Sequence, residues 1–547
     1  MICGMNRLLP RPRTVESRPG SFALPPGSAV AGPAALADAV RLAVPVPDLR
    51  PGGPDAAVRV EEDARLGPEA YELEIGDDGV RIRAGDRAGA FYAAQTLLQL
   101  LPVDAYRAAA LPGVSWTVPY GRVADAPAFS WRGAHLDVAR NFLPKREVLR
   151  LVDLLAVHKL NRLHLHLADD QGWRVESPAY PLLHEVGSHR PRTIVSHYGE
   201  EPVFDEVPHG GYYTLADLAE IAAYARARAV TVVPEIDVPG HASAILAAYP
   251  ELGVRPGERH RVLDRWGISP AILSPLPAAV AFLTTVFGEI AGAVGDVPYF
   301  HIGGDECVLD DWAASPEISA YREELGLETV GDLHAWFLRR LADALAERGS
   351  RAVVWDEAFV SGRLRQDTIV MPWRGPQVGR RAAAAGHDVV ATPVFPLYFD
   401  YAEAASPEEP AGLGDAVTVA DVAAFAPAPQ DWTAGERARV IGAQFQLWSE
   451  RIPDGRTLDY RAWPRGCAAA EVVWTGGPAG EDFGPRLKDH LARLDAFGVE
   501  YRPLDGPRPW QRGGGWRRHR PGVVVVGDVM RHLDELTHAA DSTRPSM

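Results

Sequence analysis

Short apolar runs alternate with amphipathic stretches between Phe129 and about Leu504, and this alternation limits the fold more than any other feature of the chain. Runs rich in Val, Ile and Leu are typical of strands buried on both faces of a sheet. Strands that alternate with helices predict a parallel sheet, and eight such units close into a (β/α)8 TIM barrel. The predicted strands are Gly133–Val138, Arg162–Leu167, Val230–Ile236, Tyr299–Ile302, Ala352–Trp355, Ile369–Trp373, Val389–Pro393 and Val440–Trp448.

The stretches between these runs have the spacing of helices with one buried stripe. Trp336 lies beside such a stripe, and we assign it to packing. The two clearest stripes are Val148, Leu151, Val152 and Leu155, and Leu333, Phe337, Leu341 and Leu345.

The sequence before the barrel has a different pattern. Tyr71–Ile75 and Val80–Ile82 alternate between apolar and polar residues, and a helix-like run follows from Ala88 to Leu101. We therefore predict an α/β protein in which residues 1–126 form a small α+β domain and residues 127–505 form the barrel domain. Residues 506–547, with a Gly/Arg-rich stretch, are expected to be a peripheral and partly disordered extension.

Composition excludes several classes of function. The 547-residue chain has a net charge of −16, which disfavours nucleic acid and anionic membrane surfaces as partners. Cys3, Cys307 and Cys467 are too few for a disulfide framework, and we expect them to be unpaired. The N-terminal sequence has no apolar signal region, and we expect no later segment to be apolar enough to span a bilayer. We therefore expect a cytoplasmic protein.

Polar and aromatic residues gather where the predicted strands end, which is where barrel enzymes build their active sites. His301-Ile-Gly-Gly-Asp305-Glu306 places two adjacent carboxylates after a glycine turn, and in isolation such a motif is usually just an acidic turn. Tryptophans at several strand ends fit a wall that stacks on a sugar ring, although each one alone fits core packing equally well. The strand-end residues are Asp137, Arg140, Asp169, Asp170, Glu235, Asp237, His241, Asp305, Glu306, Trp355, Trp373, Tyr398, Asp400, Trp448 and Glu450.

Several segments, taken in order, resemble the family 20 glycoside hydrolases, the β-N-acetylhexosaminidases. They are WRGAHLDVARNFLPKREVLRLVDLLAVHKLNRLHLHLADDQGWR, GGYYTLADLAEIAAYARARAVTVVPEIDVPGHA, HIGGDE, VVWDE, YFD and LWSE. The resemblance runs from Leu8 to about Asp505, including the small domain before the barrel. It implies a retaining exo-enzyme, without cofactor or metal, that removes terminal β-linked N-acetylglucosamine or N-acetylgalactosamine, with the substrate's acetamido group as nucleophile.

The resemblance also implies roles for individual residues. Glu306 would be the general acid and base, and Asp305 would orient the acetamido group. Asp169 and His241 would support Glu306. For the sugar, Arg140 would bind the outer hydroxyls, Trp355, Trp373 and Trp448 would wall the acetamido pocket, Tyr398 would donate to the acetamido oxygen, and Asp400 and Glu450 would contact the sugar or its neighbours.

Two functions other than glycoside hydrolysis are also compatible with parts of the sequence. A metal-dependent amidohydrolase would use His164, His166, His241, His301 and Asp305 as ligands. The second alternative is a sugar-binding protein without catalytic activity. It has little support, because every matched catalytic position holds the expected residue. The partner expected is a carbohydrate with a terminal N-acetylhexosamine; its glycan and the oligomeric state stay open. Residues 401–438 form a long connection that would reshape the pocket rim.

Overall fold

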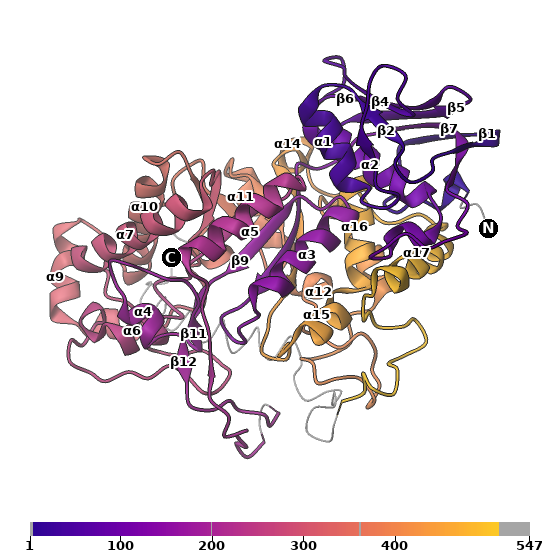
Figure 1. Ribbon diagram of the computed structural model, residues 1–547. Helices are drawn as coiled ribbons and strands as arrows, with labels where there is room; N and C mark the ends of the chain where they lie inside the picture. The colour runs from indigo at the N-terminus through magenta and orange to yellow at the C-terminus, as the bar shows by residue number, and fades with distance from the viewer. Residues whose placement is uncertain (1–3, 198–199, 360–362, 514–547) are drawn as a thin grey trace.

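The computed structural model describes residues 4–197, 200–359 and 363–513. Figure 1 shows two parts: a small N-terminal domain with a sheet at the top, and a larger barrel domain made by the rest of the described chain. The extension after residue 513 lies outside the described residues, as does Cys3.

The barrel domain contains a closed sheet of parallel strands in the order β14, β15, β16, β17, β18, β19, β8, β9. All eight predicted strands are present, and their ends differ from the prediction by no more than two residues, so the TIM barrel is confirmed. The pairing of β19 with β8, Gly442 opposite Trp131, closes the ring. The strands are β8 (Trp131–Asp137), β9 (Arg162–His166), β14 (Thr231–Glu235), β15 (Tyr299–His301), β16 (Arg351–Trp355), β17 (Ile369–Met371), β18 (Val389–Ala391) and β19 (Val440–Leu447).

Amphipathic helices surround these strands. The two predicted stripes are confirmed in α3 and α10, where each stripe residue is buried. Trp336 on α10 packs edge-on against Tyr321, as a packing residue does. The main helices are α3 (Lys145–Val157), α5 (Leu215–Ala227), α6 (Ser243–Ala248), α7 (Pro277–Val294), α9 (Pro316–Glu324), α10 (Val330–Ala346), α11 (Pro376–Ala384), α15 (Gly455–Ala462), α16 (Arg465–Thr475) and α17 (Phe483–Phe497).

Helix α7 corrects one expectation. By length and hydropathy it is apolar enough to cross a membrane, so the expectation that no segment reaches that level is wrong. In the barrel it packs between α5 and α10, with Phe282, Leu283 and Phe287 buried. The apolar residues of α7 are therefore explained by packing within the outer layer of the barrel.

The connection between β18 and β19 contains structure of its own. Helices α13 (Val419–Ala423) and α14 (Ala434–Ala438) each begin with a capping box in which a threonine side chain and an acidic side chain exchange hydrogen bonds with the backbone. These boxes are Thr418 with Asp421 and Thr433 with Glu436.

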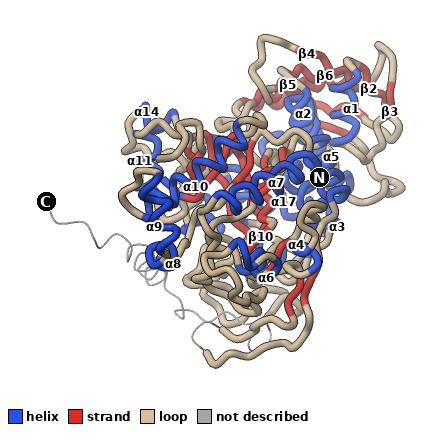
Figure 2. The backbone as a smooth tube through the Cα atoms, turned by 90° about the vertical axis from the view of Figure 1, so that its left-hand side faces the viewer, coloured by secondary structure: helices blue, strands red, loops and turns tan. Residues whose placement is uncertain are grey.

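The N-terminal domain is a seven-stranded mixed sheet in the order β1, β7, β5, β6, β4, β2, β3. Helices α1 (Ala34–Ala43) and α2 (Arg87–Leu100) lie side by side against it, as Figure 2 shows. The predicted alternation and helix are confirmed in β5, β6 and α2. The strands are β1 (Thr14–Ala23), β2 (Ala29–Ala31), β3 (Arg50–Pro51), β4 (Val58–Glu62), β5 (Tyr71–Gly76), β6 (Gly79–Ala84) and β7 (Thr117–Asp125).

Buried charges join this domain to the amino-terminal end of the barrel. Arg132, near the start of β8, forms an ion pair of 2.8 Å with Glu69. Lys159, just before β9, lies 3.3 Å from Asp125, to which the Trp474 indole also donates. Because these contacts are at the start of the strands, the opposite end, where the predicted site residues lie, is not covered by them.

Two of the three cysteines fall within the described chain. Cys307 and Cys467 are both buried and have free thiols. Burial raises the pKa of each thiol well above its usual value, so both are held in the protonated, weakly nucleophilic form.

Candidate active site

A strained turn follows β15 and carries the acidic pair. Gly303 and Gly304 have φ angles of 65° and 101°, and Glu306 itself lies in the left-handed region with φ of 51°. A Cβ on Gly303 would lie 1.6 Å from Asp237 Oδ1, so a larger residue does not fit. A non-glycine residue in this conformation costs about 1–3 kcal/mol, and such strain is found mostly where function fixes a side chain.

The strand ends enclose a pocket of about 150 Å³. It brings together most of the residues predicted from the sequence. Asp169 and Trp355 do not line it but lie behind its wall. The lining residues are Arg140, Asp237, His241, Asp305, Glu306, Trp373, Val394, Tyr398, Asp400, Tyr401, Leu413, Trp448 and Glu450.

Arg140 is held rigidly at one side of the pocket. Its guanidinium lies 2.7 Å from Asp169 Oδ2 and donates from Nε to Gln171 at 3.2 Å. The same group lies over the Trp448 ring, 4.8 Å from the centroid. An arginine fixed by a carboxylate and an aromatic face is preorganised to offer its remaining N–H groups to ligand oxygens.

A chain of polar contacts connects Asp169 to the acidic pair. Asp169 Oδ1 lies 3.2 Å from His241 Nδ1, and His241 Nε2 lies 3.4 Å from Glu306 Oε2 and 3.7 Å from Asp305 Oδ2. Burial would lower the pKa of His241, but Asp169 and Asp237 raise it well above its usual value. The imidazolium therefore donates to Asp169 and faces both carboxylates with its second N–H group.

The acidic pair shares its environment with a third carboxyl group, Asp237. Burial raises the pKa of Asp305 to about 6, with His241 lowering it and Glu306 raising it. Burial and the charge of Asp305 raise the pKa of Asp237 well above its usual value, so Asp237 stays protonated beside Asp305. Different environments for neighbouring carboxyl groups are what divides acid and base roles between them.

Three buried carboxylate oxygens of the pocket have no hydrogen-bond partner in the described part of the structure: Asp305 Oδ1, Asp400 Oδ1 and Glu450 Oε2. Burial and the charge of Glu450 raise the pKa of Asp400 to about 7. Buried acceptors are normally paired, so these atoms fit a ligand that brings hydroxyl or amide donors.

Aromatic rings form the apolar wall. Trp448 lies 6.1 Å from Tyr398 and 6.0 Å from Trp355, ring centre to ring centre. The Trp373 indole donates to Glu357 at 2.9 Å, whereas Trp355 is only 1% exposed and donates to Glu235 at 3.0 Å. Flat rings beside carboxylates and an arginine suit a sugar, whose ring has an apolar face and a polar rim.

The metal-site alternative does not gather its ligands at one point. His164 and His301 meet at Glu235 inside the barrel, whereas His241 meets Asp305 and Glu306 at the pocket. Of the five proposed ligands, His164, His166 and His301 thus surround Glu235, whereas His241 and Asp305 lie at the pocket.

Some residues of the site had no role in the sequence prediction. Asp237 was recognised only as a polar strand-end residue, and its position after a predicted strand was the signal that could have placed it. Tyr401 and Leu413 come from the long connection before β19, where no spacing points to the pocket. That connection contributes to the pocket wall, as its length had suggested.

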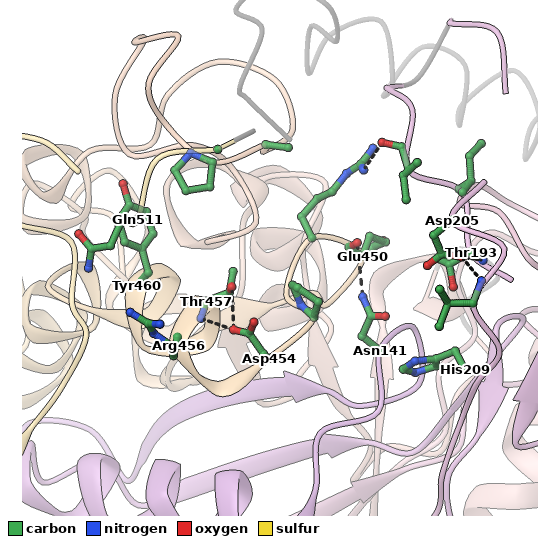
Figure 3. Close-up of a pocket in the computed structure, with 18 of the residues that line it drawn as sticks. Asn141, Thr193, Asp205, His209, Glu450, Asp454, Arg456, Thr457, Tyr460 and Gln511 are labelled. Carbon is green, nitrogen blue, oxygen red and sulfur yellow. Dashed lines mark hydrogen bonds between the residues drawn. The ribbon is translucent and has the colours of Figure 1, made fainter. Parts of the chain in front are cut away.

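A larger cleft of about 420 Å³ adjoins the pocket, and Glu450 lines both. Figure 3 shows Asn141 and Glu450 between the loop that carries Thr193 and Asp205 and the start of α15 at Asp454. Several of its charged groups are engaged with the protein: Arg456 pairs with Glu500, Arg451 donates to the Ser196 carbonyl, and Asp454 caps α15.

Comparison with known proteins assigns the family. The model of the glycosyl hydrolase family 20 catalytic domain matches residues 129–477, and that of domain 2 of the same family matches residues 5–126. The chain belongs to glycosyl hydrolase family 20. A relative from Porphyromonas gingivalis named beta-hexosaminidase is 37% identical over 85% of this chain, and the match spans 58% of that relative's length.

Other family 20 proteins match over more of their length. A beta-hexosaminidase of Akkermansia muciniphila is 32% identical over 82% of this chain and 88% of its own. The crystal structure of an exo beta-N-acetylglucosaminidase from Vibrio harveyi, in complex with N-acetylglucosamine, has a TM-score of 0.80 and 31% identity, covering 92% of this chain and 79% of that one. A Streptomyces plicatus N-acetyl-beta-hexosaminidase has a TM-score of 0.76 and 29% identity, covering 92% and 98%.

Proposed function

We propose that this protein is a retaining exo-β-N-acetylhexosaminidase that removes terminal β-linked N-acetylglucosamine or N-acetylgalactosamine. Family membership supports the reaction class, and the relatives carry names of that activity. The observation that carries the proposal is that Asp305 and Glu306 both face His241 in the pocket. Buried carboxylate oxygens of the same pocket have no hydrogen-bond donor among the described residues.

The nucleophile is proposed to come from the substrate. An enzyme that uses two carboxylates needs them on either side of the scissile bond. Asp305 and Glu306 are instead neighbours on one turn, and each has an oxygen within 4.8 Å of the other and of His241. Two groups placed on the same side fit assistance to an acetamido group that attacks from within the sugar.

The reaction would proceed in two steps. Glu306 donates its proton to the glycosidic oxygen while the acetamido carbonyl oxygen attacks C1, which expels the leaving alcohol and gives an oxazolinium ion. The Asp305 carboxylate accepts a hydrogen bond from the acetamido N–H group and stabilises the positive charge. Glu306, now ionised, takes a proton from a water that attacks C1, and the ring opens to give the sugar with retained configuration.

The remaining residues are proposed to bind the terminal sugar. Arg140 would bind its outer hydroxyls, and Asp400 and Glu450 would accept hydrogen bonds through their unpartnered oxygens. Tyr398 would donate to the acetamido oxygen. Trp373 and Trp448 line the pocket where the acetamido methyl would lie, and Trp355 supports that wall from behind.

A panel of chromogenic β-glycosides tests the proposal. Glycosides of N-acetylglucosamine and N-acetylgalactosamine should be hydrolysed, and the matching β-glucoside, which has a hydroxyl in place of the acetamido group, should be turned over extremely slowly. Activity should also persist in EDTA. Rapid hydrolysis of the β-glucoside would contradict the mechanism, and chelator-sensitive activity restored by zinc would support the metal-dependent alternative.

A further inference from the structure

A buried carboxylate lies inside the barrel beneath the pocket. Glu235, at the end of β14, is fully buried, and its oxygens are enclosed by nitrogen atoms. His164 Nε2 lies 3.0 Å away, His301 Nδ1 2.7 Å away, and the Trp355 indole donates at 3.0 Å. His166 Nδ1 makes the shortest contact of all. A buried ion is costly unless it is paired in this way.

His164 is neutral in this arrangement. The Trp131 indole donates to Gln444 Oε1 at 3.2 Å, which fixes the orientation of the amide. Gln444 Nε2 then donates to His164 Nδ1 at 3.0 Å, so the histidine carries its proton on Nε2, which lies 3.0 Å from Glu235 Oε2. Burial lowers the pKa of His164 to about 4, in agreement with a neutral ring.

His166 is in a different state because both of its ring nitrogens face carboxylates. Nδ1 contacts Glu235 and Nε2 lies 3.0 Å from Asp169 Oδ2. Each nitrogen must donate, which only the imidazolium does. Burial opposes the charge, but Glu235 and Asp169 raise the pKa of His166 well above its usual value.

Glu306, the proposed general acid, is supported by His241 and Asp169, and His166 adds a further residue to this series of contacts, deeper in the barrel. The contacts run from Glu235 to His166, to Asp169, to His241 at 3.2 Å and to Glu306 at 3.4 Å. Other groups near His166 include the buried rings of His135 and Trp448, on β8 and after β19, and the Asp137 carboxylate at the end of β8, whose charge raises the pKa of His166 further. None of these offers Asp169 a positive charge.

We propose that His166 and Glu235 are a positioning pair: Glu235 keeps His166 protonated, and His166 fixes the Asp169 carboxylate that orients His241 toward Glu306. The pair touches no substrate. This inference rests on the proposed hexosaminidase function, because its role is to hold the general acid of that reaction in place.

The test is a comparison of His166→Gln with His164→Gln. Both histidines are on β9, both are fully buried and both contact Glu235 Oε2, but only His166 reaches Asp169. In His164→Gln the new amide oxygen is expected to accept from Gln444, so the control should keep the hydrogen bond that His164 makes. A glutamine at 166 carries no charge for Asp169 to pair with.

We expect His166→Gln to lower kcat for a substrate with a poor leaving group by about tenfold to a hundredfold, with little change in KM, because Glu306 is no longer held in its working position. An activated aryl glycoside needs less help from the general acid, so its kcat should fall by less. The His164→Gln control should keep kcat close to wild type for both substrates.

Parallel losses in both variants, or equal losses of kcat for both kinds of substrate, would overturn the inference, since they would mean a general effect on the core. So would wild-type kinetics in a folded His166→Gln. If His166→Gln does not fold, as thermal unfolding would show, Glu235→Gln replaces it and should show the same larger loss of kcat for substrates with poor leaving groups. A wild-type enzyme without hexosaminidase activity would instead refute the proposed function, so the two failures are distinguishable.

Discussion

The catalytic pocket and the cleft beside it differ in size and in chemistry. The pocket is the smaller, at about 150 Å³ against about 420 Å³ for the cleft. Its walls come from the carboxyl ends of barrel strands, and its acidic groups are buried, crowded and in part unpartnered. The cleft is built largely from loops, and charges such as Arg456 and Glu500 pair with one another near solvent.

This difference teaches that chemistry, and not volume, identifies the site. Strand ends of a closed barrel are held by the core, so they can keep carboxyl groups at raised pKa and residues such as His241 and Glu306 in strained conformations. In the loops of the cleft, charged side chains pair with one another near solvent, as Arg456 and Glu500 do, and are not held in a buried or strained state. The following predictions sharpen or break this contrast.

The largest effect is expected for Glu306→Gln. It should lower kcat by a factor on the order of 10² to 10⁴ for substrates with poor leaving groups, and by less for activated aryl glycosides, because only the former need a proton in the first step. Glu500→Gln, a carboxylate of the cleft, is the matched control and should stay close to wild type. Equal losses for both kinds of substrate would argue against general acid catalysis by Glu306.

Asp305→Asn should keep the fold and lower kcat by a factor on the order of 10² to 10³, because the ionised form stabilises the charge on the acetamido nitrogen. Circular dichroism and thermal unfolding check the fold, and steady-state kinetics with an aryl N-acetylglucosaminide check the rate. A folded variant with unchanged kcat would remove Asp305 from the reaction.

The pH dependence follows from the raised pKa of Asp305, about 6. The carboxyl is protonated below that pH and ionised above it, and the mechanism needs the ionised form. We therefore expect kcat/KM to fall about tenfold for each pH unit below 6. Asp305→Asn should lose this acid limb in its residual activity. A wild-type profile that stays flat to pH 4 would contradict the assignment.

The smallest effect is expected in the cleft. Arg456→Gln breaks a solvent-exposed ion pair with Glu500, and such pairs contribute about 0–1 kcal/mol to stability. We expect less than about a twofold change in kcat/KM on aryl glycosides, since neither Arg456 nor Glu500 is among the described residues that line the catalytic pocket. A large loss would show that the cleft takes part in the reaction, and the contrast drawn above would fail.

The sequence predicted the barrel strands because parallel strands buried on both faces are nearly continuous apolar runs. The polar strand-end residues could also be placed in one region, because closure of the barrel brings the carboxyl ends of all the strands together. Trp355 shows the limit of this reasoning. It is the last residue of a predicted strand, as Trp373 is, yet it turns into the barrel and donates to Glu235, and no sequence pattern distinguishes the two.

The contacts of Glu235 required knowledge of register. In the barrel Glu235 lies opposite His166 on β9 and opposite His301 on β15. Shifting either strand would give it other partners, and a single sequence does not fix that alignment. Likewise, the wall contributed by Tyr401 and Leu413 depends on how a long connection folds back over the strand ends.

Binding of a thiazoline analogue of the bicyclic oxazoline tests the central claim most directly, because it mimics the intermediate formed when the acetamido oxygen attacks. The account predicts competitive inhibition, with binding much tighter than that of N-acetylglucosamine, since the pocket is shaped for that species. Inhibition no stronger than that by N-acetylglucosamine, together with a glycosyl ester trapped on Asp305 or Glu306, would contradict substrate assistance and show that the enzyme supplies its own nucleophile.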